Sequence, residues 1–166
     1  MDSRPRFHVI LFGIIALVFI GTNPIHAQVI EKKSLSLEGA KKIAAAAETE
    51  AKAKGARVVI AIVDDGGHLL LLERLDDTQV ASVDVGIGKA RTAAIFRRPS
   101  KVFEDQVRNG RIAALGLTGA TPLQGGIPIL VGDKVIGAIG VSGETPQQDE
   151  DIALAGAAAF KQNYKP

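Results

Sequence analysis

The sequence predicts an α+β domain in which helices pack on an antiparallel sheet. Two pairs of apolar segments are each joined by a short polar turn, and helical patterns lie before, between and after these pairs. Strands joined by such short turns pair antiparallel, because a parallel pair needs a longer crossover connection. The sequence shows no internal repeat and no long linker, so we expect one domain.

The first part of this domain is expected to form a helix followed by a hairpin. Ser36 can cap an alanine-rich helix that Gly55 ends. The segment 57–63, RVVIAIV, is β-branched and apolar, which is typical of a buried strand. The turn 64–67, DDGG, then leads into a second strand over 68–75, HLLLLERL.

Two helices are predicted after the hairpin. Apolar residues recur at three- and four-residue spacing over 79–98, and Pro99 ends this pattern. Ser100 can cap a short helix over 101–109. The next segment, 111–126, is rich in glycine and loop-forming residues.

The last part of the domain reads as a second hairpin and a final helix. The segment 126–143, GIPILVGDKVIGAIGVSG, contains two apolar strands joined by Gly132 and Asp133. Thr145–Gln148 resembles a capping box with proline at the first helical position. We expect the helix that follows to run to about Asn163.

Residues 1–27 have the layout of a secretory signal peptide. Two early arginines precede an apolar run over 9–20, and Ala27 is a small residue at a suitable cleavage position. The run is shorter than the ~20 residues that a transmembrane helix needs. We therefore expect residues 28–166 to be periplasmic or secreted. An uncleaved N-terminal anchor is the alternative.

The composition narrows the possible chemistry. The chain has no cysteine, so thiolate catalysis and cysteine ligation are excluded. Its three histidines include His8 and His26 in the leader, which leaves His68 as the one histidine of the domain. One histidine cannot build a structural zinc site, because such a site needs four ligands, mostly cysteine and histidine. The formal net charge is only +2 and no basic cluster stands out, so no nucleic-acid partner is expected.

Several local patterns allow two interpretations. VGIGKA, over 85–90, imitates a phosphate loop but departs from the required spacing and lies in a helical pattern. Two aspartate pairs, 64–65 and 76–77, could bind a cation, although aspartate also favours turns. His68 could be a ligand or simply the first residue of a strand.

A second candidate site lies before the last helix. Ser142 and Glu144 could line a pocket near Gly125, where exposed helix amides attract carboxylates. The alternative is plain helix capping. A pocket there would suit an isomerase, deaminase or hydrolase that acts on a small carboxylic acid, with Glu144 or His68 as the general base.

Three longer segments carry a family resemblance. VVIAIVDDGGHLLLLERLDD, ASVDVGIGKARTAAIFRRPS and LQGGIPILVGDKVIGAIGVSGETPQQDEDIALAG occur in this order. The chain resembles the GlcG/HbpS family, whose module also forms the C-terminal domain of PduO-type cobalamin adenosyltransferases. The likeness extends from about Ser34 to Phe160.

The resemblance implies a profilin-like fold with a five-stranded antiparallel sheet, assembly into homo-oligomers, and haem binding. It implies His68 or Thr92 as the iron ligand, with Arg97 and Arg98 as partners of the haem propionates. Phe96 and Phe103 would pack on the porphyrin face. The alternative is that both belong to the core.

We therefore expect a secreted protein that stores, buffers or senses haem, with a membrane sensor as a possible partner. The alternatives are the enzyme described above and an assembly module without a cofactor. The alanine- and glycine-rich faces of the first and last helices would allow close contacts between subunits.

Overall fold

The computed structural model describes residues 29–163, with side chains as far as residue 161. The chain divides into two units, Met1–Glu31 and Lys32–Pro166. Residues 29–31 of the first unit have no regular secondary structure, and the predicted signal peptide lies outside the described residues. No helix within the described part of the chain is long and apolar enough to cross a membrane. The second unit holds the fold.

The helices and strands follow one another in the predicted order. The helices are α1 (Leu37–Ala53), α2 (Ser82–Ile95), α3 (Lys101–Arg108), the 3₁₀ helix η2 (Ile112–Gly116) and α4 (Pro146–Asn163). The strands are β1 (Val59–Asp64), β2 (Leu69–Arg74), β3 (Gly126–Val131) and β4 (Lys134–Ser142).

The four strands form one antiparallel sheet in the order β2-β1-β4-β3. The predicted α+β class is therefore confirmed, but the expectation of five strands is wrong for the described residues. The segment before α1 comes nearest to a further strand, because Leu35 N donates to Ile136 O at 2.8 Å beyond the end of β1. This single bond does not make a strand, and the segment between α3 and β3 forms η2 and loops.

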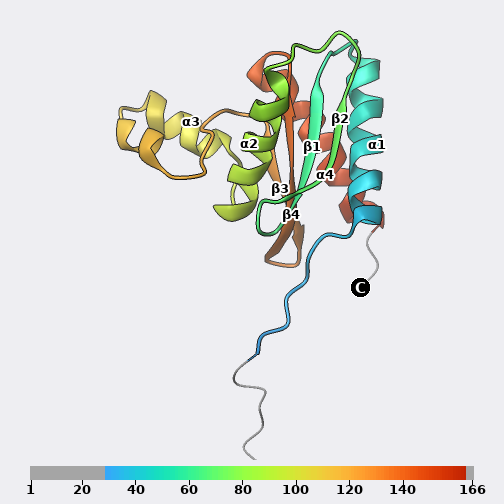
Figure 1. Cartoon of the computed structure of the whole chain (residues 1–166), viewed down its shortest axis with the longest axis horizontal. Helices are drawn as coiled ribbons and strands as arrows, with labels where there is room; N and C mark the ends of the chain where they lie inside the picture. The colour runs from blue at the N-terminus through green and yellow to red at the C-terminus, as the bar shows by residue number, and fades with distance from the viewer. Residues whose placement is uncertain (1–28, 164–166) are drawn as a thin grey trace, which may run out of the picture. The chain divides into compact units, whose positions relative to one another are not determined.

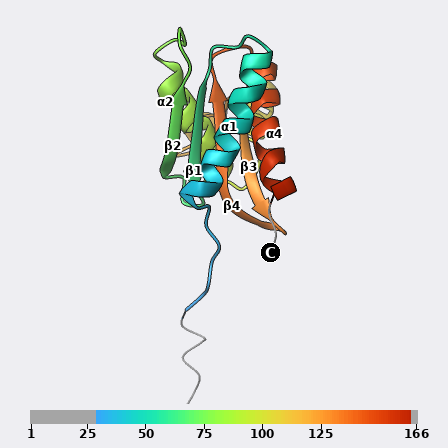
Figure 2. The same cartoon turned by 90° about the vertical axis from the view of Figure 1, so that its right-hand side faces the viewer.

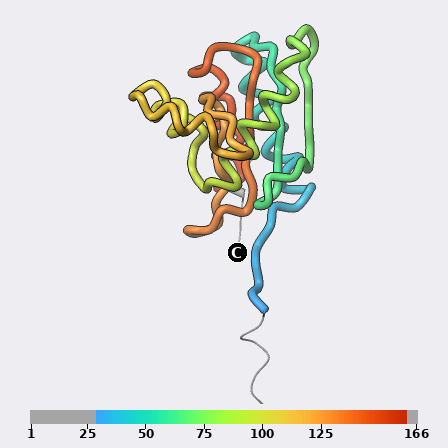
Figure 3. The backbone as a smooth tube through the Cα atoms, turned by 60° about the vertical axis from the view of Figure 1, so that its left-hand side comes forward, coloured from blue at the N-terminus to red at the C-terminus, as the bar shows by residue number. Residues whose placement is uncertain are grey.

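Helices cover both faces of the sheet. α1 and α4 pack side by side on one face, and α2 lies on the other (Figures 1 and 2). The alternation of β1 explains this, since Ile60 and Ile62 belong to the α1–α4 core, whereas Ala61 and Val63 belong to the α2 core. α3 and η2 stand out beside α2 (Figures 1 and 3).

α2 approaches the sheet closely because small residues face each other. A side chain at Gly140 of β4 would collide with the backbone of α2 at Gly86 O and Ala90 N. A side chain at Gly86 would press on Val59 at 3.2 Å. Because α2 lies close to the sheet, its polar residues Ser82 and Lys89 come near the end of β4 at Ser142.

The helix caps test the sequence predictions in detail. Ser36 accepts the Gly39 amide at 3.1 Å, and Thr145 with Gln148 forms the predicted capping box, so both predictions are confirmed. The Ser100 side chain does not cap α3. Its hydroxyl instead donates to Leu123 O at 2.5 Å and accepts from Gly126 N at 2.8 Å, and thereby attaches the preceding loop to β3.

Candidate functional site

A polar cavity of about 320 Å³ lies where α2 and α4 begin and β4 ends. It brings together residues that are far apart in the sequence. The side chains that carry its polar chemistry are Ser82, Lys89, Gln124, Ser142, Glu144 and Asp149.

The floor of the cavity is a buried ion pair. Lys89 Nζ lies 2.7 Å from Asp149 Oδ2 and donates a second hydrogen bond to Val141 O at 2.9 Å. The exposed fractions of the two side chains are only 5% and 3%. Such groups are buried together because each compensates the charge of the other. The pair joins the middle of α2 to the first turn of α4.

Asp149 also organises the turn before α4. Its Oδ1 accepts the Glu144 amide at 3.1 Å, and Gly143 contributes a further backbone hydrogen bond. Burial raises the pKa of Asp149 above its usual value, while the Lys89 ammonium and these amides act in the opposite direction. The carboxylate therefore depends on its partners to remain ionised.

The residues of the predicted carboxylic-acid pocket do line or adjoin this cavity. Ser142 is 5% exposed there, and Gly125 lies next to Lys89, since a side chain at Gly125 would come within 3.1 Å of Nζ. Glu144 is exposed, and its Oε1 accepts the Arg57 amide at 2.9 Å. Glu144 thus satisfies a backbone group ahead of β1, which weighs against its role as a free general base.

His68 lies elsewhere, at the turn between β1 and β2. Its side chain is 74% exposed, and Nδ1 lies 3.4 Å from Asp64 Oδ1. The same carboxylate oxygen accepts the amides of Gly66 and His68 at 2.9 and 2.8 Å, so the turn interpretation of Asp64 is confirmed. Across this turn, Arg91 Nε of α2 donates to Gly67 O at 3.3 Å.

Thr92 is fully buried, unlike His68. Its hydroxyl donates to Gly88 O at 2.7 Å and accepts the Thr121 amide at 2.7 Å. It joins α2 to the loop before β3. Both functions of the hydroxyl are used, so the geometry disfavours Thr92 as an iron ligand.

The other residues that the resemblance implied gather at the end of α2. Phe96 packs against Phe103 with ring centroids 4.9 Å apart, and the Arg98 guanidinium lies 5.9 Å from the centre of the Phe103 ring. Phe103 is buried and Phe96 partly so, which fits the core alternative. Arg97 and Arg98 are exposed, and Arg97 has a φ of 56° where the chain leaves the helix.

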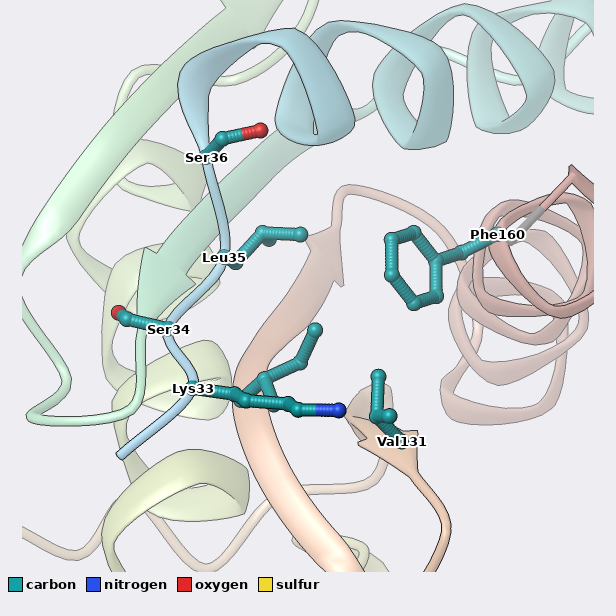
Figure 4. A pocket seen from close by; sticks show the side chains of 7 residues that line it. Lys33, Ser34, Leu35, Ser36, Val131 and Phe160 are labelled. Atoms are coloured by element: carbon teal, nitrogen blue, oxygen red, sulfur yellow. The ribbon is translucent and has the colours of Figure 1, made fainter. Parts of the chain in front are cut away.

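A second cavity, of about 410 Å³, lies at the opposite end of the α1–α4 face. Leu35, Val131, Ile136 and Phe160 supply most of its surface, and Lys33 extends along one side (Figure 4). None of the predicted site residues lines it. Within residues 29–163 there is no group of three or more His, Asp or Glu side chains that could hold a metal ion, and Asp65 pairs with Lys32 instead.

Sequence reasoning missed Lys89, Asp149 and Ser82. The interpretation of 85–90 as a helical imitation of a phosphate loop is confirmed, because α2 spans this segment. One signal was present: Lys89 occurs between Gly86 and Ala90, on the face of α2 that packs on the sheet. A charge on such a face needs a buried partner, but the sequence does not show that Asp149 is that partner.

The fold and this cavity define a small α+β domain in which helices cover both faces of an antiparallel sheet. Residues 35–158 match the family described as "Haem degrading protein HbpS-like", and the chain belongs to this family. Protein GlcG of Escherichia coli K12 is 46% identical over 111 residues, covering 67% of this chain and 83% of GlcG.

Solved structures agree with the family. A crystal structure of HbpS has a TM-score of 0.74 at 30% identity and covers 80% of this chain and 94% of its own. A crystal structure described as a PduOC–haem complex has a TM-score of 0.69 at 27% identity, with coverages of 76% and 94%. These matches support a haem-related function.

Proposed function

We propose that this protein binds haem at the turn between β1 and β2, with His68 as the iron ligand. Membership of the HbpS-like family and the likeness to a haem complex support the choice of ligand. The observation that carries the choice of site is the exposed imidazole of His68 beside the Asp64 carboxylate.

The geometry around His68 suits an iron ligand. A histidine that binds a metal donates its other ring N–H to a carboxylate or carbonyl, which fixes the tautomer and the ring orientation. Asp64 Oδ1 lies 3.4 Å from Nδ1, and a small rotation of the ring would let Nδ1–H donate to it and leave the Nε2 lone pair for iron. Asp64 is itself held in place by two backbone amides.

The surroundings of His68 supply apolar and cationic groups. Leu69 and Ile95 are 48% and 38% exposed, and Ile95 lies against Gly67 in the same turn. Exposed apolar side chains of this kind can cover a porphyrin face. Arg91 is exposed beside the turn and, with Arg97 and Arg98, can pair with propionates.

The wider proposal follows the sequence. The predicted signal peptide, 1–27, would place the protein in a periplasm or outside the cell, where it would store, buffer or sense haem as a homo-oligomer. A membrane sensor would be its partner in a sensing role. The profilin-like assignment of the fold belongs to the same proposal.

A haemin titration followed by the Soret band tests the site. The purified protein should give a sharp band that saturates at a fixed stoichiometry, and His68→Ala should abolish it. The matched comparison is between the full chain and residues 28–166, which lack His8 and His26 and should give the same band.

Thr92→Val separates the two candidate ligands. It should leave the band in place while circular dichroism reports the fold. A band that survives in His68→Ala but disappears in folded Thr92→Val would assign the iron to Thr92 and refute our choice. A broad, unsaturable shift in all variants would refute specific haem binding at this turn.

A further inference from the structure

We propose that the cavity between the starts of α2 and α4 is a binding site for a small monocarboxylate, separate from the haem site. Ser142 and Glu144 line this cavity and Gly125 adjoins it, and the groups that define the proposed site are Ser82 and Lys89. This proposal concerns binding alone and does not depend on haem binding.

The first observation is a hydroxyl without a partner. Ser82 lines the cavity, is 2% exposed, and its Oγ forms no hydrogen bond with any described residue. Buried hydroxyls are nearly always hydrogen-bonded, because burial removes them from water. A ligand oxygen in the cavity would satisfy this group.

The second observation is the buried ammonium of Lys89. An ammonium has three N–H donors. Two of them serve Asp149 Oδ2 and Val141 O, at 2.7 and 2.9 Å. The structure shows no acceptor for the third among the described residues, and since Lys89 lines the cavity we assign this donor to the ligand.

The third observation is the direction of the two helices. Ala81 and Ser82 at the start of α2, and Pro146 and Asp149 at the start of α4, all line the cavity. Helix N-termini carry a partial positive charge and attract anions. The N-cap of α2 is an alanine, which offers no side-chain oxygen to the first-turn amides.

The charges around the cavity limit the ligand to no more than one negative charge. Asp149 offsets the charge of Lys89, and Glu144 adds a carboxylate at the rim. A dianion such as phosphate would meet both carboxylates, whereas a neutral molecule would gain nothing from the helix dipoles. A small carboxylate, with one charge and two acceptor oxygens, matches Ser82 and Lys89.

Calorimetric titration of the whole protein with isobutyrate at pH 8.5, where phosphate is a dianion, tests the proposal. The matched neutral probe is isobutyramide, which has nearly the same shape, and inorganic phosphate is the dianionic probe. We expect saturable binding of isobutyrate. The amide should bind more weakly by about tenfold or more, because it lacks charge-assisted hydrogen bonds. Phosphate should also bind more weakly by about tenfold or more, because its second charge is repelled by Asp149 and Glu144.

Ser82→Ala should weaken isobutyrate binding by about fivefold, the effect of one hydrogen bond. Thr78→Val is its matched control, since Thr78 Oγ1 is also buried without a partner but Thr78 does not line the cavity. This control should bind isobutyrate like the parent protein. Because the Ser82 hydroxyl has no protein partner, its removal should leave the fold intact.

Equal binding of isobutyrate and isobutyramide would overturn the charge argument, and tighter binding of phosphate would overturn the ligand class. Unchanged binding in Ser82→Ala, or no saturable binding of isobutyrate at all, would overturn the site. His68→Ala should bind isobutyrate normally, so the haem proposal and this one can fail separately.

Discussion

Replacing Lys89 by methionine should be among the most destabilising single substitutions in this protein. Methionine keeps most of the length of the side chain but removes the ammonium that faces Asp149 at 2.7 Å. Asp149 is only 3% exposed, so water in the adjoining cavity can compensate for the lost ammonium only in part. Removing one member of a buried ion pair costs about 3–5 kcal/mol.

The surrounding hydrogen bonds place the expected loss at the lower end of this range. Asp149 keeps the Glu144 amide at 3.1 Å, which still stabilises the carboxylate. We therefore expect the free energy of unfolding to fall by about 3 kcal/mol. Urea denaturation followed by circular dichroism would measure the change.

A double variant isolates the charge from the packing. Lys89→Met/Asp149→Leu replaces the pair by apolar side chains and removes the hydrogen bonds to Val141 O and to the Glu144 and Gly143 amides, at a cost of about 1–2 kcal/mol. The double variant should therefore be more stable than Lys89→Met. A single variant that loses less than about 1 kcal/mol, or that is no less stable than the double variant, would refute this reasoning.

The loss in Lys89→Met should also depend on pH. Burial raises the pKa of Asp149, and the variant lacks the ammonium that opposes this effect. A carboxyl whose pKa is higher in the folded state than in the unfolded state stabilises the fold when protonated. The deficit should thus shrink as the pH falls toward about 4, the ordinary aspartate value.

Three further substitutions test other contacts. Gly140→Ala should lower the free energy of unfolding, measured by urea denaturation, by about 3 kcal/mol, because the new methyl group collides with the α2 backbone. The control Gly116→Ala faces open space and should change this free energy by less than about 0.5 kcal/mol. Thr92→Val should lower the free energy of unfolding by about 1–3 kcal/mol in the same assay, since the hydroxyl both donates and accepts. Thr92→Ser keeps the hydroxyl, so a smaller loss in Thr92→Val than in Thr92→Ser would contradict this. Hydrogen bonding to Lys32 lowers the pKa of Asp65, so Asp65→Asn should have a lower melting temperature than the parent protein at pH 7. This difference in melting temperature should vanish as the pH falls through the depressed pKa. An equal difference at pH 7 and pH 2 would count against the ion pair.

The secondary structure could be predicted because its signals are local. The Ser36 cap, the turn glycines and the capping box at Thr145 each act within a few residues, and the structure confirms them. The start of α2 was placed three residues too early, at 79 instead of Ser82, because residues 79–81 form a turn that ends in an alanine cap. Boundaries of this kind depend on hydrogen bonds that apolar periodicity does not encode.

The candidate ligands were harder to assign than the elements. His68 and Thr92 were equal candidates in the sequence, and only their surroundings separate them. His68 lies in the turn before the edge strand β2 and remains exposed, whereas Thr92 faces the loop before β3 and uses its hydroxyl there. Glu144 read as a possible base, but its partner, the Arg57 amide, is 87 residues away in the chain.

The α+β class, the order of the elements and the absence of cysteine chemistry follow from residue types and short-range periodicity, so the amino-acid sequence is enough to predict them. Which polar groups meet depends instead on the tertiary structure. Lys89 and Asp149 are 60 residues apart, and they pair because α2 and α4 pack on opposite faces of the sheet while their first turns approach the same end of β4. Contacts of such separation are set by packing, which no local pattern records.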